Sequence, residues 1–132
     1  MAGETVHIEI EEHAAGRVAR VTMDNRARLN AGSQRLVRRL REALDGLAGD
    51  DDLRCLVLTG AGDKAFMGGA DLNELVSFDR EGARAMITNL HEACRAIRRF
   101  PVPVIGRLRG YCLGAVWRSR PPATSGRATA VS

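Results

Sequence analysis

The sequence predicts an α/β fold, and three observations lead to this prediction. Residues 6–10 and 18–23 alternate apolar and polar side chains, which is typical of half-exposed strands. Apolar residues recur at helical spacing after residue 33 and again after residue 79. Between these two helical patterns, residues 55–59 form a short apolar run, which predicts a buried strand. Strands that alternate with helices in this way are typical of an α/β domain.

The first half of the chain predicts a hairpin followed by a helix. Gly16 marks a turn between the two alternating stretches, so they are expected to pair as antiparallel strands. Residues 24–32 are polar and are expected to form a loop. Ser33 can cap the helix that follows, and Gly46 with the glycine and aspartates after it is expected to stop that helix. The apolar stripe of the helix is Leu36, Val37, Leu40, Leu44 and Leu47.

The apolar run at residues 55–59 is expected to be a strand covered on both faces. A glycine turn at residues 60–64 and the run AFMGGADL at residues 65–72 follow it. Asp71 is expected to cap a short helix that ends near residue 77. Glu74 is expected to reach back to the start of that helix, which would complete a capping box.

The small residues before this short helix can accept a ligand. Gly68, Gly69 and Ala70 leave backbone N–H groups uncovered, so a ligand oxygen can approach them closely. The helix N-terminus adds positive potential at the same place. The pattern alone leaves two interpretations open, an oxyanion-binding loop and an ordinary tight turn.

A second unit repeats the arrangement of strand and glycine turn. A helix is expected from residue 79 to residue 99, and the prolines at 101 and 103 end it. Its apolar stripe is Met86, Leu90, Ala93, Cys94 and Ile97. Residues 104–108 indicate another strand, and residues 110–115 again bring glycines and small side chains. Two such turns in one sheet could direct two sets of N–H groups into one cleft, since α/β sheets bind ligands at strand ends.

Composition and length exclude several classes of protein. The 132 residues form one domain or part of one, and no apolar run approaches the ~20 residues that span a bilayer. Without a visible secretory signal or membrane segment, a cytoplasmic protein without a membrane partner is expected. The three cysteines are an odd number without metal-like spacing, which favours reduced core thiols and predicts no metal site.

The net charge of +4 does not predict a nucleic-acid partner. Residues 116–132 contain three arginines and no acidic residue, so the rest of the chain carries 17 basic against 16 acidic residues. This near-neutral remainder offers few aromatic side chains for base stacking. No nucleic-acid partner is therefore expected.

Three segments together resemble the enoyl-CoA hydratase/isomerase (crotonase) family. They are residues 55–72, residues 103–115, and the short motif Arg28-Leu29-Asn30-Ala31. The resemblance implies a crotonase-like (ClpP/crotonase) spiral of ββα repeats that is incomplete here, with residues 1–115 as the N-terminal part of the domain. It also implies acyl-CoA thioesters as substrates.

The family's oxyanion-stabilising groups map onto two positions of this chain. By motif, the backbone N–H groups of Gly68 and Ala115 would stabilise the enolate that forms at the thioester carbonyl. The residues that the resemblance places along the substrate path are Ala27, Leu29, Ala65, Gly68, Gly69, Ala70, Asp71, Leu72, Tyr111 and Ala115. No cofactor is implied, because coenzyme A is part of the substrate. Intact relatives form trimers and hexamers, whereas such an assembly is doubtful for this chain.

The sequence departs from the family pattern in ways that leave its activity open. Met67 stands where a smaller residue is common, and Arg107 and Arg109 bring charge near the second motif. The family's usual catalytic glutamates follow that motif, but the last acidic residue here is Glu92, and Arg118 stands where a glutamate is expected. The hypotheses are a weakly active or inactive enoyl-CoA hydratase, an isomerase, and a non-catalytic acyl-CoA binder.

Residues 116–132 show neither helical nor strand periodicity, which predicts either a disordered polar tail or a frameshift. Suitable codons for AVWRSRPPATS, read in the adjacent frame, can spell GLEVAAACDL, the continuation that the resemblance leads us to expect. One lysine against nineteen arginines is typical of a GC-rich gene, in which wrong frames stay open. We expect the coding DNA around codons 114–117 to restore this continuation. Codons that do not spell it in either alternative frame would reject the frameshift.

Overall fold

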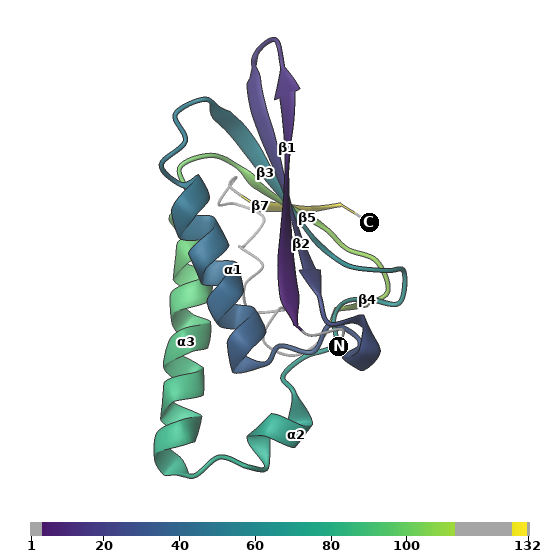
Figure 1. Ribbon diagram of the computed structural model, residues 1–132, viewed down its shortest axis with the longest axis vertical. Helices are drawn as coiled ribbons and strands as arrows, with labels where there is room; N and C mark the ends of the chain where they lie inside the picture. Colours follow the sequence, from purple (N-terminus) through teal and green to yellow (C-terminus); the bar gives the residue numbers. More distant parts are fainter. Residues whose placement is uncertain (1–3, 113–127, 132) are drawn as a thin grey trace.

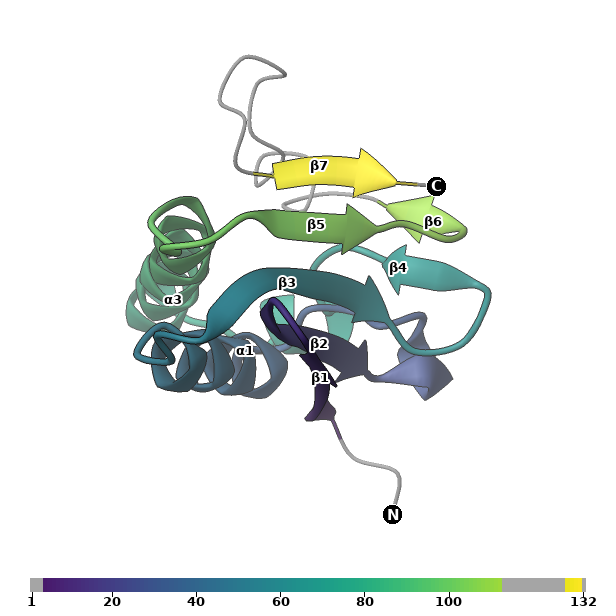
Figure 2. The ribbon, with the colours of Figure 1, turned by 90° about the horizontal axis from the view of Figure 1, so that it is seen from above.

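The computed structural model describes residues 4–112 and 128–131, and its main feature is a five-stranded mixed sheet. The strand order is β1 (Thr5–His13), β2 (Gly16–Asp24), β3 (Leu53–Gly60), β5 (Val104–Arg107) and β7 (Ala128–Val131). The first pair is antiparallel and every later pair is parallel. Figure 2 shows β2, β3, β5 and β7 as successive neighbours. The predicted hairpin and the α/β class are confirmed.

Two long helices lie side by side and pack on this sheet (Figure 1). They are α1 (Gln34–Leu47) and α3 (Arg80–Arg98), and a short helix α2 (Leu72–Leu75) precedes α3. A separate two-stranded parallel sheet joins β4 (Ala65–Met67) to β6 (Tyr111–Cys112). It lies beside the carboxyl-terminal ends of β3 and β5 (Figure 2). In the described part of the chain, no helix is long and apolar enough to cross a membrane.

The core forms where α1 and α3 meet the sheet. Its most deeply buried side chains come from β2, α1 and β3, and they include Val21, Leu36, Leu44 and Leu56, each at most 1% exposed. Alternate strand residues and every third or fourth helix residue supply this core, as the periodicity predicts. Ser33 caps α1 as expected, because its hydroxyl accepts a hydrogen bond of 3.1 Å from the backbone N–H of Leu36.

The prediction that β3 is covered on both faces is wrong. Leu53, Leu56 and Leu58 are buried, whereas the alternating residues Cys55 and Val57 are only half-buried. Successive strand residues point to opposite faces, and among the described elements α1 and α3 cover one of them. A short run of consecutive apolar residues therefore does not distinguish full coverage from coverage on one side.

Other elements differ from the sequence prediction in detail. α1 continues through Gly46 and ends at Leu47. The stripe of α3 includes the buried Asn89, whose side chain accepts from Arg41 at 2.8 Å and donates to the carbonyl of Gln34 at 3.1 Å. β7 is a strand that the pattern of the tail does not predict, and it pairs with β5. The remaining tail residues of that prediction, 116–127 and 132, lie outside the described residues.

Candidate functional site

The run at residues 65–72, here called the glycine loop, leads from β4 to the first residue of α2. Gly69 adopts a φ of +97°, a conformation that side chains rarely adopt, so glycine is required there. Gly68 is half-buried and Gly69 is buried. The glycine loop is therefore partly exposed at Gly68.

Residues 25–33, here called the asparagine loop, pack directly against the glycine loop. The N–H of Gly32 donates to the carbonyl of Gly69 at 2.7 Å. The carbonyl oxygen of Leu29 lies 2.9 Å from the position that a Cβ on Gly68 would take. Gly68 is therefore needed for the close approach of the two loops, because any side chain there would push Leu29 away.

Asn30 joins the asparagine loop to the glycine turn and to β4. Its side-chain carbonyl accepts from the N–H of Asn25 at 2.8 Å, and its NH₂ group donates to the carbonyls of Ala61 at 3.0 Å and Ala65 at 2.8 Å. The residue is 1% exposed and has a φ of +54°. Asparagine is one of the few residues that tolerate this left-handed conformation, so the position combines a backbone and a side-chain requirement.

Asp71 fixes the other end of the glycine loop. Its carboxylate accepts from the N–H groups of Asn73 and Glu74 at the start of α2, which confirms the predicted cap. It also pairs with the half-exposed Arg28 of the asparagine loop at 3.3 Å. The side chain of Asp71 is only 8% exposed and that of Arg28 is 51% exposed, and the ion pair between them links the two loops.

The predicted capping box is wrong in one part, because Glu74 does not reach back to its own helix. Its carboxylate instead accepts from the N–H of Gln34, the first residue of α1, at 3.1 Å. A carboxylate is favourable at a helix N-terminus, where N–H groups lack partners within the helix. Glu74 and Ser33 thus cap α1 together, and Glu74 ties α2 to it.

The second glycine turn lies beside the first. The N–H of Tyr111 donates to the carbonyl of Lys64 at 3.0 Å, and Tyr111 is opposite Ala65 in the β4–β6 pair. Gly110 adopts a φ of +66° and lies so close to Lys64 that a side chain would overlap its carbonyl. The two turns therefore lie side by side as far as residue 112, whereas the direction of their N–H groups into one cleft stays a prediction. Ala115, the second predicted oxyanion residue, lies outside the described residues.

Most of the other predicted site residues lie in or beside the two loops, and the exposed fractions of their side chains differ. Leu29, Gly68, Gly69, Ala70 and Asp71 form the contact between the two loops. The predicted path residues with exposed side chains are Ala27, Leu29, Leu72 and Tyr111. Ala65 is 2% exposed and packs in the interior, so its carbonyl, which holds Asn30, is the group it contributes.

Charges around the loops are locally paired. Asp24, which precedes the asparagine loop, binds His7 at 3.2 Å and Arg26 at 3.0 Å. Burial alone would raise the pKa of Asp24, but these hydrogen bonds outweigh it and lower that pKa below its ordinary value. Arg109, expected to bring charge into the approach to the site, is exposed and pairs with Asp63 of the glycine turn.

Sequence reasoning missed two groups that assemble the site, the Asn30 side chain and the Arg28–Asp71 ion pair. Asn30 carried one available signal, since an asparagine in a polar loop is a candidate for positive φ and for bonds to nearby backbone. The ion pair spans 43 positions in the sequence. No local spacing could have predicted it.

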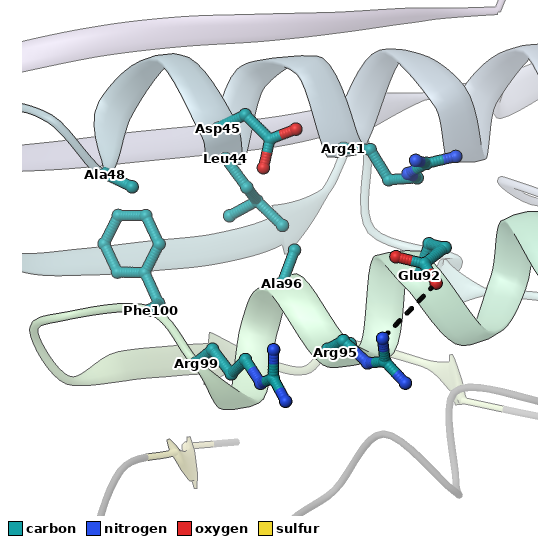
Figure 3. A pocket seen from close by; sticks show the side chains of 9 residues that line it. All are labelled: Arg41, Leu44, Asp45, Ala48, Glu92, Arg95, Ala96, Arg99 and Phe100. Atoms are coloured by element: carbon teal, nitrogen blue, oxygen red, sulfur yellow. Dashed lines mark ion pairs between the residues drawn. The ribbon is translucent and has the colours of Figure 1, made fainter.

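A groove between α1 and α3 is a further concave feature with charged side chains (Figure 3). Its volume is about 270 Å³, and Leu44 and Phe100 lie among its lining residues. Arg41, Arg95 and Arg99 are offset there by Asp45 and Glu92, and Glu92 pairs with Arg95 at 3.6 Å. None of its lining residues belongs to either loop. In residues 4–112 and 128–131, no group of three His, Cys, Asp or Glu side chains could hold a metal ion.

The fold defines the class of protein. It is an α/β domain in which glycine-rich segments lie at the carboxyl-terminal ends of parallel strands, the end at which open α/β sheets generally bind ligands.

Comparisons with known proteins give the family. Residues 13–116 match the family model described as enoyl-CoA hydratase/isomerase. The chain is 30% identical over 115 residues to crotonyl-CoA hydratase of Syntrophomonas wolfei, and 32% identical over 111 residues to 1,2-epoxyphenylacetyl-CoA isomerase of Escherichia coli. These alignments cover 86% and 80% of this chain and 42% of each relative. The chain belongs to the enoyl-CoA hydratase/isomerase family.

Solved structures agree with this assignment. The crystal structure of an enoyl-CoA hydratase from Bacillus anthracis superposes with a TM-score of 0.77 at 28% identity, covering 85% of this chain and 43% of that one. The fold is therefore crotonase-like and incomplete relative to these enzymes, as predicted. The chain spans less than half the length of the relatives that it matches.

Proposed function

We propose that this chain binds acyl-CoA thioesters, with the N–H of Gly68 directed at the thioester carbonyl oxygen. The observation that carries the proposal is the half-buried Gly68, held between the asparagine loop and the β4–β6 pair in a member of this family. A backbone donor held in place can stabilise negative charge on a carbonyl oxygen without reorganising during the reaction. Ala115 would supply the second N–H.

The bound thioester would be polarised toward an enolate. In the longer relatives this polarisation would serve the addition of water to a trans-2-enoyl-CoA, which gives a 3-hydroxyacyl-CoA, or a shift of the double bond. Both reactions also need a group that moves a proton, typically a carboxylate. No cofactor enters this proposal, because coenzyme A is part of the substrate.

The carboxylates beside the glycine loop are already engaged, which supports binding over turnover for this chain. Asp71 caps α2 and pairs with Arg28, and Glu74 caps α1. Neither carboxylate is free to activate water. The first candidate function is therefore acyl-CoA binding with weak or no hydration. Hydratase or isomerase activity is the second candidate, and the names of the relatives support it.

Binding through the carbonyl can be tested with a matched pair of ligands. Crotonyl-CoA carries the thioester carbonyl, and the corresponding crotyl thioether of CoA has a CH₂ group in place of that carbonyl. We expect calorimetry to show about five- to tenfold tighter binding of the thioester, since one hydrogen bond contributes a net ~1 to 1.5 kcal/mol. The infrared carbonyl band of bound, isotope-labelled crotonyl-CoA should also move to lower wavenumber.

Equal affinity for the two ligands, or an unshifted carbonyl band, would count against carbonyl recognition. Turnover is followed separately by chromatographic detection of 3-hydroxybutyryl-CoA. Steady hydration by the purified 132-residue chain would replace the binder interpretation by the hydratase one.

A further inference from the structure

We infer that Asn30 is a positioning residue, which sets the place of the Gly68 N–H through bonds to the backbone around the glycine loop. This inference rests on the proposed function of Gly68. Asn30 itself does not touch the ligand in this account, because its side chain is 1% exposed.

The first step of the argument is the set of segments that Asn30 joins. Its amide holds Asn25 at the start of the asparagine loop, Ala61 at the start of the glycine turn, and Ala65 at the start of β4. Gly68 comes only three residues after Ala65, across a strand whose residues are all buried. A displacement of the Ala65 carbonyl is therefore carried along β4 to Gly68.

The second step is that the neighbour of Asn30 contacts Gly68 directly. The carbonyl oxygen of Leu29 lies against the α-carbon face of Gly68, at 2.9 Å from an added Cβ. Leu29 and Asn30 both have positive φ, at 55° and 54°. Asn30 thus controls Gly68 by two routes, through Ala65 from one side and through Leu29 from the other.

The third step is the chemistry of the Asn30 side chain. One amide oxygen and two amide hydrogens meet one donor and two acceptors, and the geometry leaves no room for water between them. A carboxylate of the same shape would keep the bond from Asn25 but would face the carbonyls of Ala61 and Ala65 with negative charge. The bond to the glycine turn at Ala61 and the bond to the glycine loop at Ala65 would both become repulsive, since a carboxylate is an acceptor only.

The test uses two variants of the whole chain, both in a Gly46→Ala background. Gly46 lies in α1 with open space around it, so alanine there is expected to stabilise the fold without touching the site. Asn30→Asp makes the ties repulsive, and Asn30→Gly removes them while keeping the positive φ accessible. The matched control is Asn89→Asp, the same change at a buried asparagine on α3 that contacts neither loop.

The readout is the infrared carbonyl band of isotope-labelled crotonyl-CoA at saturating protein. We expect both Asn30 variants to lose most of the downward shift seen with the parent chain, and the Asn89 variant to retain it. Retention of the full shift by a folded Asn30→Gly variant would overturn the positioning role. So would failure of both variants to fold in the stabilised background, because Asn30 would then determine the whole fold. A parent chain without any shift would instead refute the proposed function.

Discussion

Gly60→Ala is expected to destabilise the chain by at least about 3 kcal/mol, enough to remove much of the stability of a domain of this size. A Cβ on Gly60 would lie 2.3 Å from the carbonyl oxygen of Phe66 and 2.7 Å from that of Ala65. Both atoms belong to the backbone of β4, which the pairing with β6 and the bond from Asn30 hold in place. The clash therefore has no flexible side chain to absorb it.

The matched control is Gly46→Ala. Nothing lies within 4 Å of a Cβ at Gly46, and the residue is inside α1, so this change should stabilise the chain by roughly 1 kcal/mol. Urea unfolding followed by circular dichroism measures both variants. If Gly60→Ala unfolded at the same urea concentration as the parent chain, the close contact between the end of β3 and β4 would be refuted.

The sequence predicted the elements of the fold where periodicity carried the information. The stripe of α1, the cap at Ser33 and the hairpin around Gly16 depend on residues within one turn or one strand pair, and each was found. The coverage of β3 depends on what packs over each face, which is a property of the assembled sheet. β7 was missed for a related reason, since its pairing with β5 depends on a distant strand.

In the candidate site too, the local patterns could be predicted from the sequence and the long-range contacts could not. The glycine loop and the cap at Asp71 are local patterns, and they predicted the start of α2. The groups that hold the loop in place come from the asparagine loop, more than thirty positions away. Glu74 shows the limit most clearly, because a local rule assigned it to its own helix and the fold uses it to cap α1.

Leu56→Ala is expected to cost about 3 kcal/mol, within the ~2 to 5 kcal/mol range for buried leucines. Leu56 is 0% exposed in the middle of β3 and faces the core that α1 and α3 cover. Truncation removes three carbon atoms from a site that the rigid strand cannot close, so the lost burial and the cavity add.

Val57→Ala is the comparison that makes this prediction informative. Val57 is the next residue of the same strand, but it points to the opposite face, where it lies between Arg20 and Ile105 and is only half-buried. We expect a loss of about 1 kcal/mol or less, because part of its surface remains in contact with water and little cavity forms. Denaturant unfolding of the two variants under identical conditions gives the difference directly. A cost for Val57→Ala equal to that for Leu56→Ala would show that both faces of β3 are packed in solution, as the apolar run at residues 55–59 suggested.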